Sequence, residues 1–96
     1  MKKQVTCIAR FIAKRGKTEQ LKESLLKLID PTRKEDGCLS YNLHKDMGNE
    51  NCFTMIEEFK SKEAFDLHGK QPYLEDFKSI VSEIAESVSV TLYKKV

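Results

Sequence analysis

The stretch that decides the fold runs Cys38-Leu39-Ser40-Tyr41-Asn42-Leu43-His44-Lys45, then through residues 46–51 to Cys52-Phe53-Thr54-Met55-Ile56-Glu57-Glu58-Phe59. Both outer segments alternate apolar and polar residues, a pattern typical of a β-strand with one buried face. The segment between them contains Gly48 and two asparagines, which favour tight turns. The sequence therefore predicts a hairpin with strands at 38–45 and 52–59.

The alternation also predicts how the two strands pair. A shift of one residue would turn every side chain to the opposite face, so odd-numbered residues should pair with odd-numbered ones. The shared face is then apolar, with Leu39, Tyr41, Leu43, Phe53, Met55 and Phe59. Glu57 falls on the same face, with Tyr41 as the candidate residue opposite. Because a carboxylate there is costly unless it is paired or protonated, Glu57 is the first candidate functional residue.

The segments around the hairpin complete a recognisable order of elements. Residues 5–13 alternate as a strand, and from Thr18 apolar residues recur at helical spacing (positions 21, 25, 28 and 29). Asp30-Pro31 is expected to cap a fresh helical turn, and Gly37 to end it in the left-handed conformation. After the hairpin, Ser61 is the expected N-cap of a short helix over 62–68.

Pro72 opens a second amphipathic helix, and residues 87–93 alternate as a last strand. The order β-α-β-β-α-β predicts a ferredoxin-like α+β fold, in which helices cover one face of a four-stranded antiparallel sheet. Ile8, Ile12 and Ile56 would lie on the uncovered face, which suggests a partner.

Length and composition narrow the possible functions. The 96 residues predict a single domain over 1–96, and the 40% hydrophobic and 33% charged residues are typical of a soluble globular protein. No apolar run is long enough to cross a membrane. The first residues lead into a strand and not into a signal core, so we expect a cytoplasmic protein. A net charge of +2, without a basic block, does not support nucleic-acid binding.

The sequence indicates no metal site and no cofactor. Cys7, Cys38 and Cys52 are widely spaced and are expected to be reduced, buried thiols. His44 and His68 have no acidic or cysteine companion at the spacing of metal ligands. No glycine-rich loop offers a seat for a nucleotide.

Several segments together resemble the antibiotic biosynthesis monooxygenase (ABM) domain family. They are residues 31–41 (PTRKEDGCLSY), then Phe53 with Glu57 and Phe59, and then Ala64 with His68, Pro72 and Phe77. The resemblance covers essentially the whole chain. It implies a homodimeric α/β barrel in which two sheets pack face to face, and a small apolar pocket between sheet and helices. Monooxygenases of this kind use no metal, haem or flavin, because the deprotonated phenol or quinol gives an electron directly to dioxygen.

The resemblance also implies roles for individual residues. His68 is the candidate base, and Glu57 orients it or accepts a substrate proton. Tyr41 and Tyr73 are expected to hold the substrate, although a common family version has histidine at position 73. The remaining candidates for the substrate-binding wall are Phe53, Met55, Phe59, Phe65 and Phe77. Each residue has a structural alternative: His68 as an ordinary helix-end histidine, Glu57 paired with Arg10, and the aromatic residues as plain core.

The leading hypothesis is a cofactor-independent monooxygenase that acts on a small aromatic phenol or quinol with dioxygen. One alternative is an isomerase or hydrolase-like enzyme for a small hydroxylated or phosphorylated carbonyl compound. A phosphorylated substrate would also need a lysine or arginine at the pocket mouth. The other alternative is a non-catalytic dimer that binds a small apolar ligand.

Overall fold

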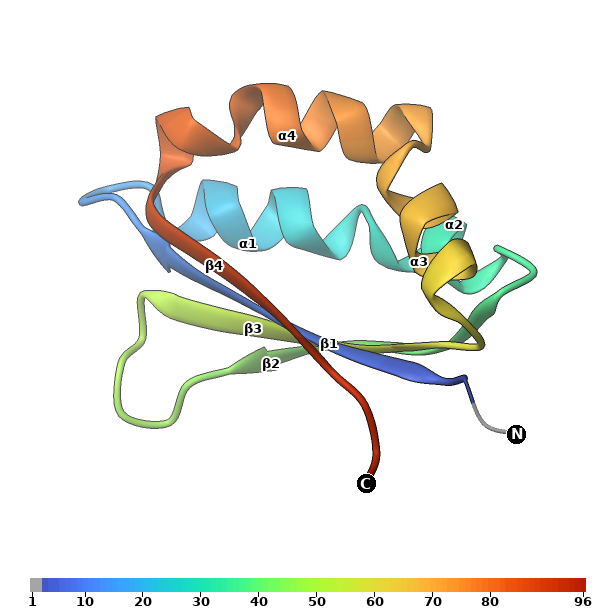
Figure 1. The fold of residues 1–96 in the computed structure, drawn as a ribbon. Coiled ribbons are helices and arrows are strands. Elements are labelled where there is room, and N and C mark those ends of the chain that lie inside the picture. Colours follow the sequence, from blue (N-terminus) through green and yellow to red (C-terminus); the bar gives the residue numbers. More distant parts are fainter. Residues whose placement is uncertain (1–2) are drawn as a thin grey trace.

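A computed structural model describes residues 3–96. Met1 and Lys2, on which the expectation of no signal peptide partly rests, lie outside the described residues. The elements are β1 (Val5–Ala13), α1 (Thr18–Leu26), α2 (Ile29–Arg33), β2 (Cys38–Lys45), β3 (Cys52–Phe59), α3 (Lys62–Gly69), α4 (Pro72–Ile84) and β4 (Ala85–Tyr93). The strands form one antiparallel sheet in the order β2-β3-β1-β4, with the helices on one side of it (Figure 1). The predicted ferredoxin-like α+β fold is confirmed.

The β2–β3 hairpin pairs as predicted over most of its length. Tyr41 lies opposite Glu57, and Leu43 lies opposite Met55. A bulge interrupts the pairing between Cys38 and Ser40, and Leu39 is 54% exposed. The expectation that Leu39 shares the buried face is therefore wrong, because a bulge locally changes which side chains face the core. Cys38 packs against the core instead.

The helix boundaries follow the local signals, with two corrections. The Ser61 hydroxyl accepts a hydrogen bond from the Ala64 backbone N–H at 3.1 Å, and Pro72 is the first residue of α4. However, α2 begins at Ile29, before Asp30 and Pro31. Gly37 is not left-handed, since Gly16 is the one described residue with a positive φ, of 78°. Gly37 is a packing position, because a side-chain carbon there would collide with Ala64 of α3.

The core lies between the helices and the sheet face that β1 and β3 turn toward them. Helices α1 and α4 contribute its largest apolar side chains on their side, namely Leu21, Leu25, Phe77 and Ile84. The edge-to-face contact of Phe11 with Phe77, with ring centroids 5.7 Å apart, links the two layers. On the other sheet face Ile8, Ile12 and Ile56 are half-buried.

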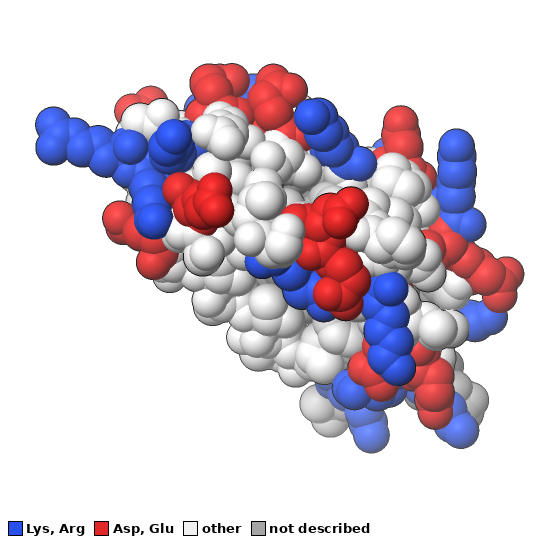
Figure 2. Space-filling view, turned by 90° about the horizontal axis from the view of Figure 1, so that it is seen from above, with Lys and Arg blue, Asp and Glu red and all other residues white. Residues whose placement is uncertain are grey.

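Strand β4 is less well covered than the rest of the sheet. Val88, Val90 and Leu92 pair with Phe11, Ala9 and Cys7 on β1, so they point to the helical side, yet all three are exposed. On the side seen from above the helices, basic and acidic residues are interspersed (Figure 2). Within residues 3–96 no helix is both long enough and apolar enough to cross a bilayer.

Candidate active site

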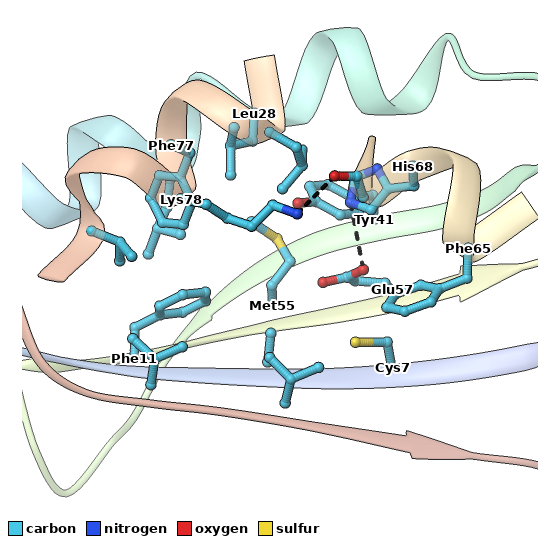
Figure 3. Close-up of a pocket in the computed structure, with 17 residues that line it drawn as sticks. Cys7, Phe11, Leu28, Tyr41, Met55, Glu57, Phe65, His68, Phe77 and Lys78 are labelled. Atoms are coloured by element: carbon cyan, nitrogen blue, oxygen red, sulfur yellow. Dashed lines mark hydrogen bonds and ion pairs between the residues drawn. The ribbon is translucent and has the colours of Figure 1, made fainter. Parts of the chain in front are cut away.

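A cavity of about 300 Å³ lies between the sheet and the helices. Its walls are mostly apolar and come from both layers, including Phe11 and Met55 of the sheet and Leu28 and Phe77 of the helical side (Figure 3). The side chains that bring polar groups to it are Cys7, Tyr41, Glu57, His68 and Lys78. An apolar cavity with a few convergent polar groups is the usual form of a small-molecule site.

His68 of α3 is positioned by an acid outside the cavity. Its Nδ1 lies 2.9 Å from Oε2 of Glu35, and its side chain is 5% exposed against 12% for Glu35. Because a carboxylate can only accept, Nδ1 carries the hydrogen of this bond. In the neutral imidazole the lone pair is then at Nε2. Nε2 lies 3.9 Å from Oε1 of Glu57, which is too long for a hydrogen bond.

Glu35 is a functional candidate that the sequence did not single out. It lies in the segment between α2 and β2, and its Oε2 also accepts a hydrogen bond from the Tyr73 hydroxyl. The contact with His68 depends on Gly37, whose lack of a side chain lets α3 approach closely at Ala64. Ala64 precedes His68 by one helical turn, so this close approach places Glu35 beside the imidazole.

Glu57 is buried in the cavity wall, and its Oε1 has no hydrogen-bond partner. Burial raises the pKa of Glu57 to about 8, although the Cys7 thiol beside it lowers this pKa and the charge of Glu35 raises it further. The alternative pairing with Arg10 does not occur, because Arg10 lies 3.9 Å from Asp46. Glu57 is therefore mostly a neutral acid at pH 7, with a proton to donate.

Tyr41 lies next to both His68 and Glu57. Its ring centroid lies 5.4 Å from that of His68, in an edge-to-face arrangement, and its backbone pairs with that of Glu57. Arg33 of α2 donates two hydrogen bonds to the Tyr41 carbonyl, at 3.1 and 2.9 Å, which ties β2 to the helical layer. Burial raises the pKa of Tyr41 far above its usual value, so the phenol stays protonated and can donate to a ligand.

The structure brings only some of the sequence candidates to the cavity. Those that line it are Tyr41, Met55, Glu57, Phe65, His68 and Phe77. Phe53 and Phe59 are buried core residues outside the lining, and Tyr73 is directed to Glu35. We therefore leave these three out of the proposed substrate wall. Within residues 3–96 no group of three or more metal-ligating side chains is arranged to hold an ion.

Comparison with known proteins places this chain in a family. Residues 4–79 match the family described as antibiotic biosynthesis monooxygenase (ABM). The chain belongs to this family. The ABM fold and the helix-lined cavity thus agree with the resemblance carried by residues 31–41 and by Glu57, His68 and Pro72.

Two relatives of this ABM protein differ in how much of its length they match. It is 34% identical over 94 residues to "Putative monooxygenase Rv0793" of Mycobacterium tuberculosis, covering 96% of this chain and 91% of the relative. It is 31% identical over 67 residues to "Uncharacterized protein sll1783" of Synechocystis, covering 69% of this chain but only 46% of that relative. The chain thus spans less than half of the length of the second relative.

A solved structure shows the same fold over nearly the whole chain. The crystal structure of protein SO0527 from Shewanella oneidensis superposes with a TM-score of 0.95 at 33% identity, covering 99% of this chain and 93% of that one. The names of the family and of the Mycobacterium tuberculosis relative both refer to monooxygenases.

Proposed function

We propose that this ABM protein is a cofactor-independent monooxygenase that acts on a small aromatic phenol or quinol. The observation that carries the proposal is the buried His68, whose Nδ1 is held 2.9 Å from Glu35 while its Nε2 is left free of hydrogen bonds on the side of Glu57. A base with a fixed tautomer beside an apolar cavity is suited to removing the proton of a bound hydroxyl group.

The reaction begins with proton transfer from the substrate hydroxyl to Nε2 of His68. The resulting anion transfers one electron to dioxygen, and the substrate radical and superoxide combine to form a carbon–oxygen bond. The oxygen–oxygen bond then breaks, which leaves a quinone carbonyl and releases water. The proton held on His68 and the hydrogen of the reacting carbon both leave in that water, so the step needs no outside reductant.

The side chains around His68 have distinct roles in this scheme. Glu35 is a positioning residue that fixes the imidazole and stabilises its protonated form, a role that the sequence had suggested for Glu57. Glu57, as a neutral acid, donates a hydrogen bond to the oxygen intermediate. Tyr41 donates to the substrate oxygen, and the apolar wall keeps the anion poorly solvated and therefore reducing.

The test is oxygen uptake with a panel of reduced naphthoquinols and anthracene-type phenols, with a metal chelator present. We expect uptake that survives the chelator and is abolished by His68→Ala. His44→Ala is the matched control, because His44 is an exposed histidine of β2 outside the cavity. Uptake that stays at the spontaneous rate with every substrate would contradict the proposal.

One observation favours a second candidate, an isomerase for a small hydroxy-carbonyl compound with an anionic group. Such a substrate needs a cation at the cavity, and Lys78 is among the lining residues. The same His68 would move a proton between neighbouring carbons without consuming oxygen. Proton exchange at the carbon next to the carbonyl, followed by NMR in heavy water under anaerobic conditions, distinguishes this activity from oxygenation.

A further inference from the structure

Among the described residues that line the cavity, Lys78 of α4 is the one with a permanently basic side chain, either lysine or arginine. Figure 3 shows its side chain reaching over the cavity toward His68. Its Nζ donates a hydrogen bond of 2.7 Å to the carbonyl oxygen of Gly69, the residue that follows His68. The ammonium is thus held at the same end of the cavity as the proposed base.

The ammonium has capacity left for a ligand. It has three N–H groups, of which one is used by Gly69, and the carboxylate of Glu75 lies 3.7 Å away. The Lys78 side chain is 51% exposed, so the charge lies at the cavity mouth and not in its apolar interior. A ligand anion at the mouth stays partly hydrated, which avoids the cost of burying it fully.

The other titratable groups of the lining do not cancel this charge at neutral pH. Glu57 is mostly protonated because burial raises its pKa to about 8. The thiol of Cys7 is neutral, because burial raises its pKa to about 12. Glu75 is the carboxylate that competes for Lys78, and it lies on the solvent side of α4.

We infer that the ligand of this cavity is an amphipathic aromatic acid, whose apolar ring fills the cavity while a carboxylate or similar anion pairs with Lys78 at the mouth. This inference names the substrate class of the proposed oxygenase, and it rests on that proposal only in taking the cavity as the substrate site. Lys78 is accordingly a specificity-determining residue, which selects acidic phenols over neutral ones.

The test is a binding measurement without oxygen, so that turnover does not enter it. Calorimetry compares a hydroxynaphthoate with its methyl ester, which has the same ring but no charge. We expect wild-type protein to bind the acid more tightly, by roughly five-fold, as for a half-exposed ion pair. Lys78→Met should remove this preference, Lys78→Arg should keep it, and added salt should weaken it.

Two further variants separate a site from a general charge effect. Lys62→Met is the matched control, because Lys62 is a helix lysine that is 58% exposed and paired with Asp66, but lies outside the cavity lining. It should leave the preference unchanged. Glu75→Gln removes the competing carboxylate and should strengthen the preference for the acid.

Several outcomes would overturn the inference: equal affinity for acid and ester, a preference that survives Lys78→Met, an equal loss in Lys62→Met, or no binding of either compound. Oxygen uptake with equal binding of acid and ester would support the proposed function and reject the inference. Binding of the acid that depends on Lys78, without any oxygen uptake, would do the reverse.

Discussion

A buried histidine needs hydrogen-bond partners for its ring nitrogens. In His68, Nδ1 has such a partner in Glu35, whereas Nε2 faces Glu57 at 3.9 Å without a hydrogen bond. The Glu35–His68 contact joins residues 33 positions apart and is completed by the Tyr73 hydroxyl on the same oxygen. The carboxylate orients the imidazole, and in the proposed reaction it faces the positive charge that proton abstraction creates. Both contacts are made by the Oε2 atom of Glu35, so a single substitution of Glu35 tests its role.

We predict that Glu35→Gln lowers kcat roughly ten-fold while KM changes little, because the amide keeps the shape but not the charge that stabilises protonated His68. His68→Ala, which removes the base itself, should lower kcat by about 100-fold or more. Steady-state oxygen uptake measures both. The control is Asp36→Asn, since this neighbouring acid is exposed and pairs with Lys60. A change in KM alone for Glu35→Gln would argue against a role in proton transfer.

The raised pKa of Glu57 predicts how the free energy of unfolding changes with pH. Its pKa is raised from 4.5 to about 8, so the folded protein holds a proton that the unfolded chain has already lost in this range. Stability should therefore fall as pH rises from about 4.5 to 8 and then level off, with a slope of at most ~1.4 kcal/mol per pH unit from this group. Urea unfolding at several pH values measures the slope.

The variant Glu57→Gln isolates this contribution. It should flatten the loss of stability between these pH values and leave the unfolding free energy near pH 8 higher than that of the wild type. Glu58→Gln is the control, since Glu58 points to the other face of β3. An unchanged slope in Glu57→Gln would show that Glu57 does not titrate in this range.

At the scale of elements, the site depends on how closely α3 approaches the segment before β2. We predict that Gly37→Ala destabilises the protein by about 1–3 kcal/mol, the usual cost of forcing an extra carbon into a packed contact. It should also reduce activity, because α3 must move and take His68 away from Glu35. Urea unfolding and oxygen uptake measure the two effects.

Gly48→Ala provides the matched control for that substitution. Its added carbon would meet only Asp46, at an ordinary 3.5 Å, in the exposed hairpin loop. We expect little change in stability or activity. If both glycine variants were equally stable, direct packing of α3 on Gly37 would not be what holds His68 in place.

At the scale of the whole molecule, the helices cover one sheet face, and β4 keeps apolar side chains exposed at the edge of the cavity. The family resemblance predicts that a second copy packs against the uncovered face, where Ile8, Ile12 and Ile56 are half-buried. Light scattering should therefore give the mass of a dimer at micromolar concentration.

A charge on this face should disrupt that assembly. We expect Ile56→Lys to shift the protein to monomer, because it would bury an unpaired ammonium between the sheets. Leu67→Lys is the control, since Leu67 is an exposed residue of α3 on the helical side. A monomeric wild-type protein would contradict the predicted dimeric barrel.

The sequence by itself determined the order of the elements, the pairing of Tyr41 with Glu57, the N-cap at Ser61 and the start of α4 at Pro72. These features depend on periodicities and signals that act over a few residues. The sequence also marked Glu57 and His68, because an acid on an apolar strand face is conspicuous and the family motif includes both residues.

Only the tertiary structure decided which groups meet. The bulge that exposes Leu39, the direct packing of α3 on Gly37 and the reach of Lys78 over the cavity all depend on contacts between distant segments. For the same reason Tyr73 and Glu35 form one hydrogen-bonded group with His68, whereas Phe53 and Phe59 are core residues. A side chain's role here follows from its neighbours in space, and local sequence patterns predict such neighbours only within the hairpin, where the alternation sets the register.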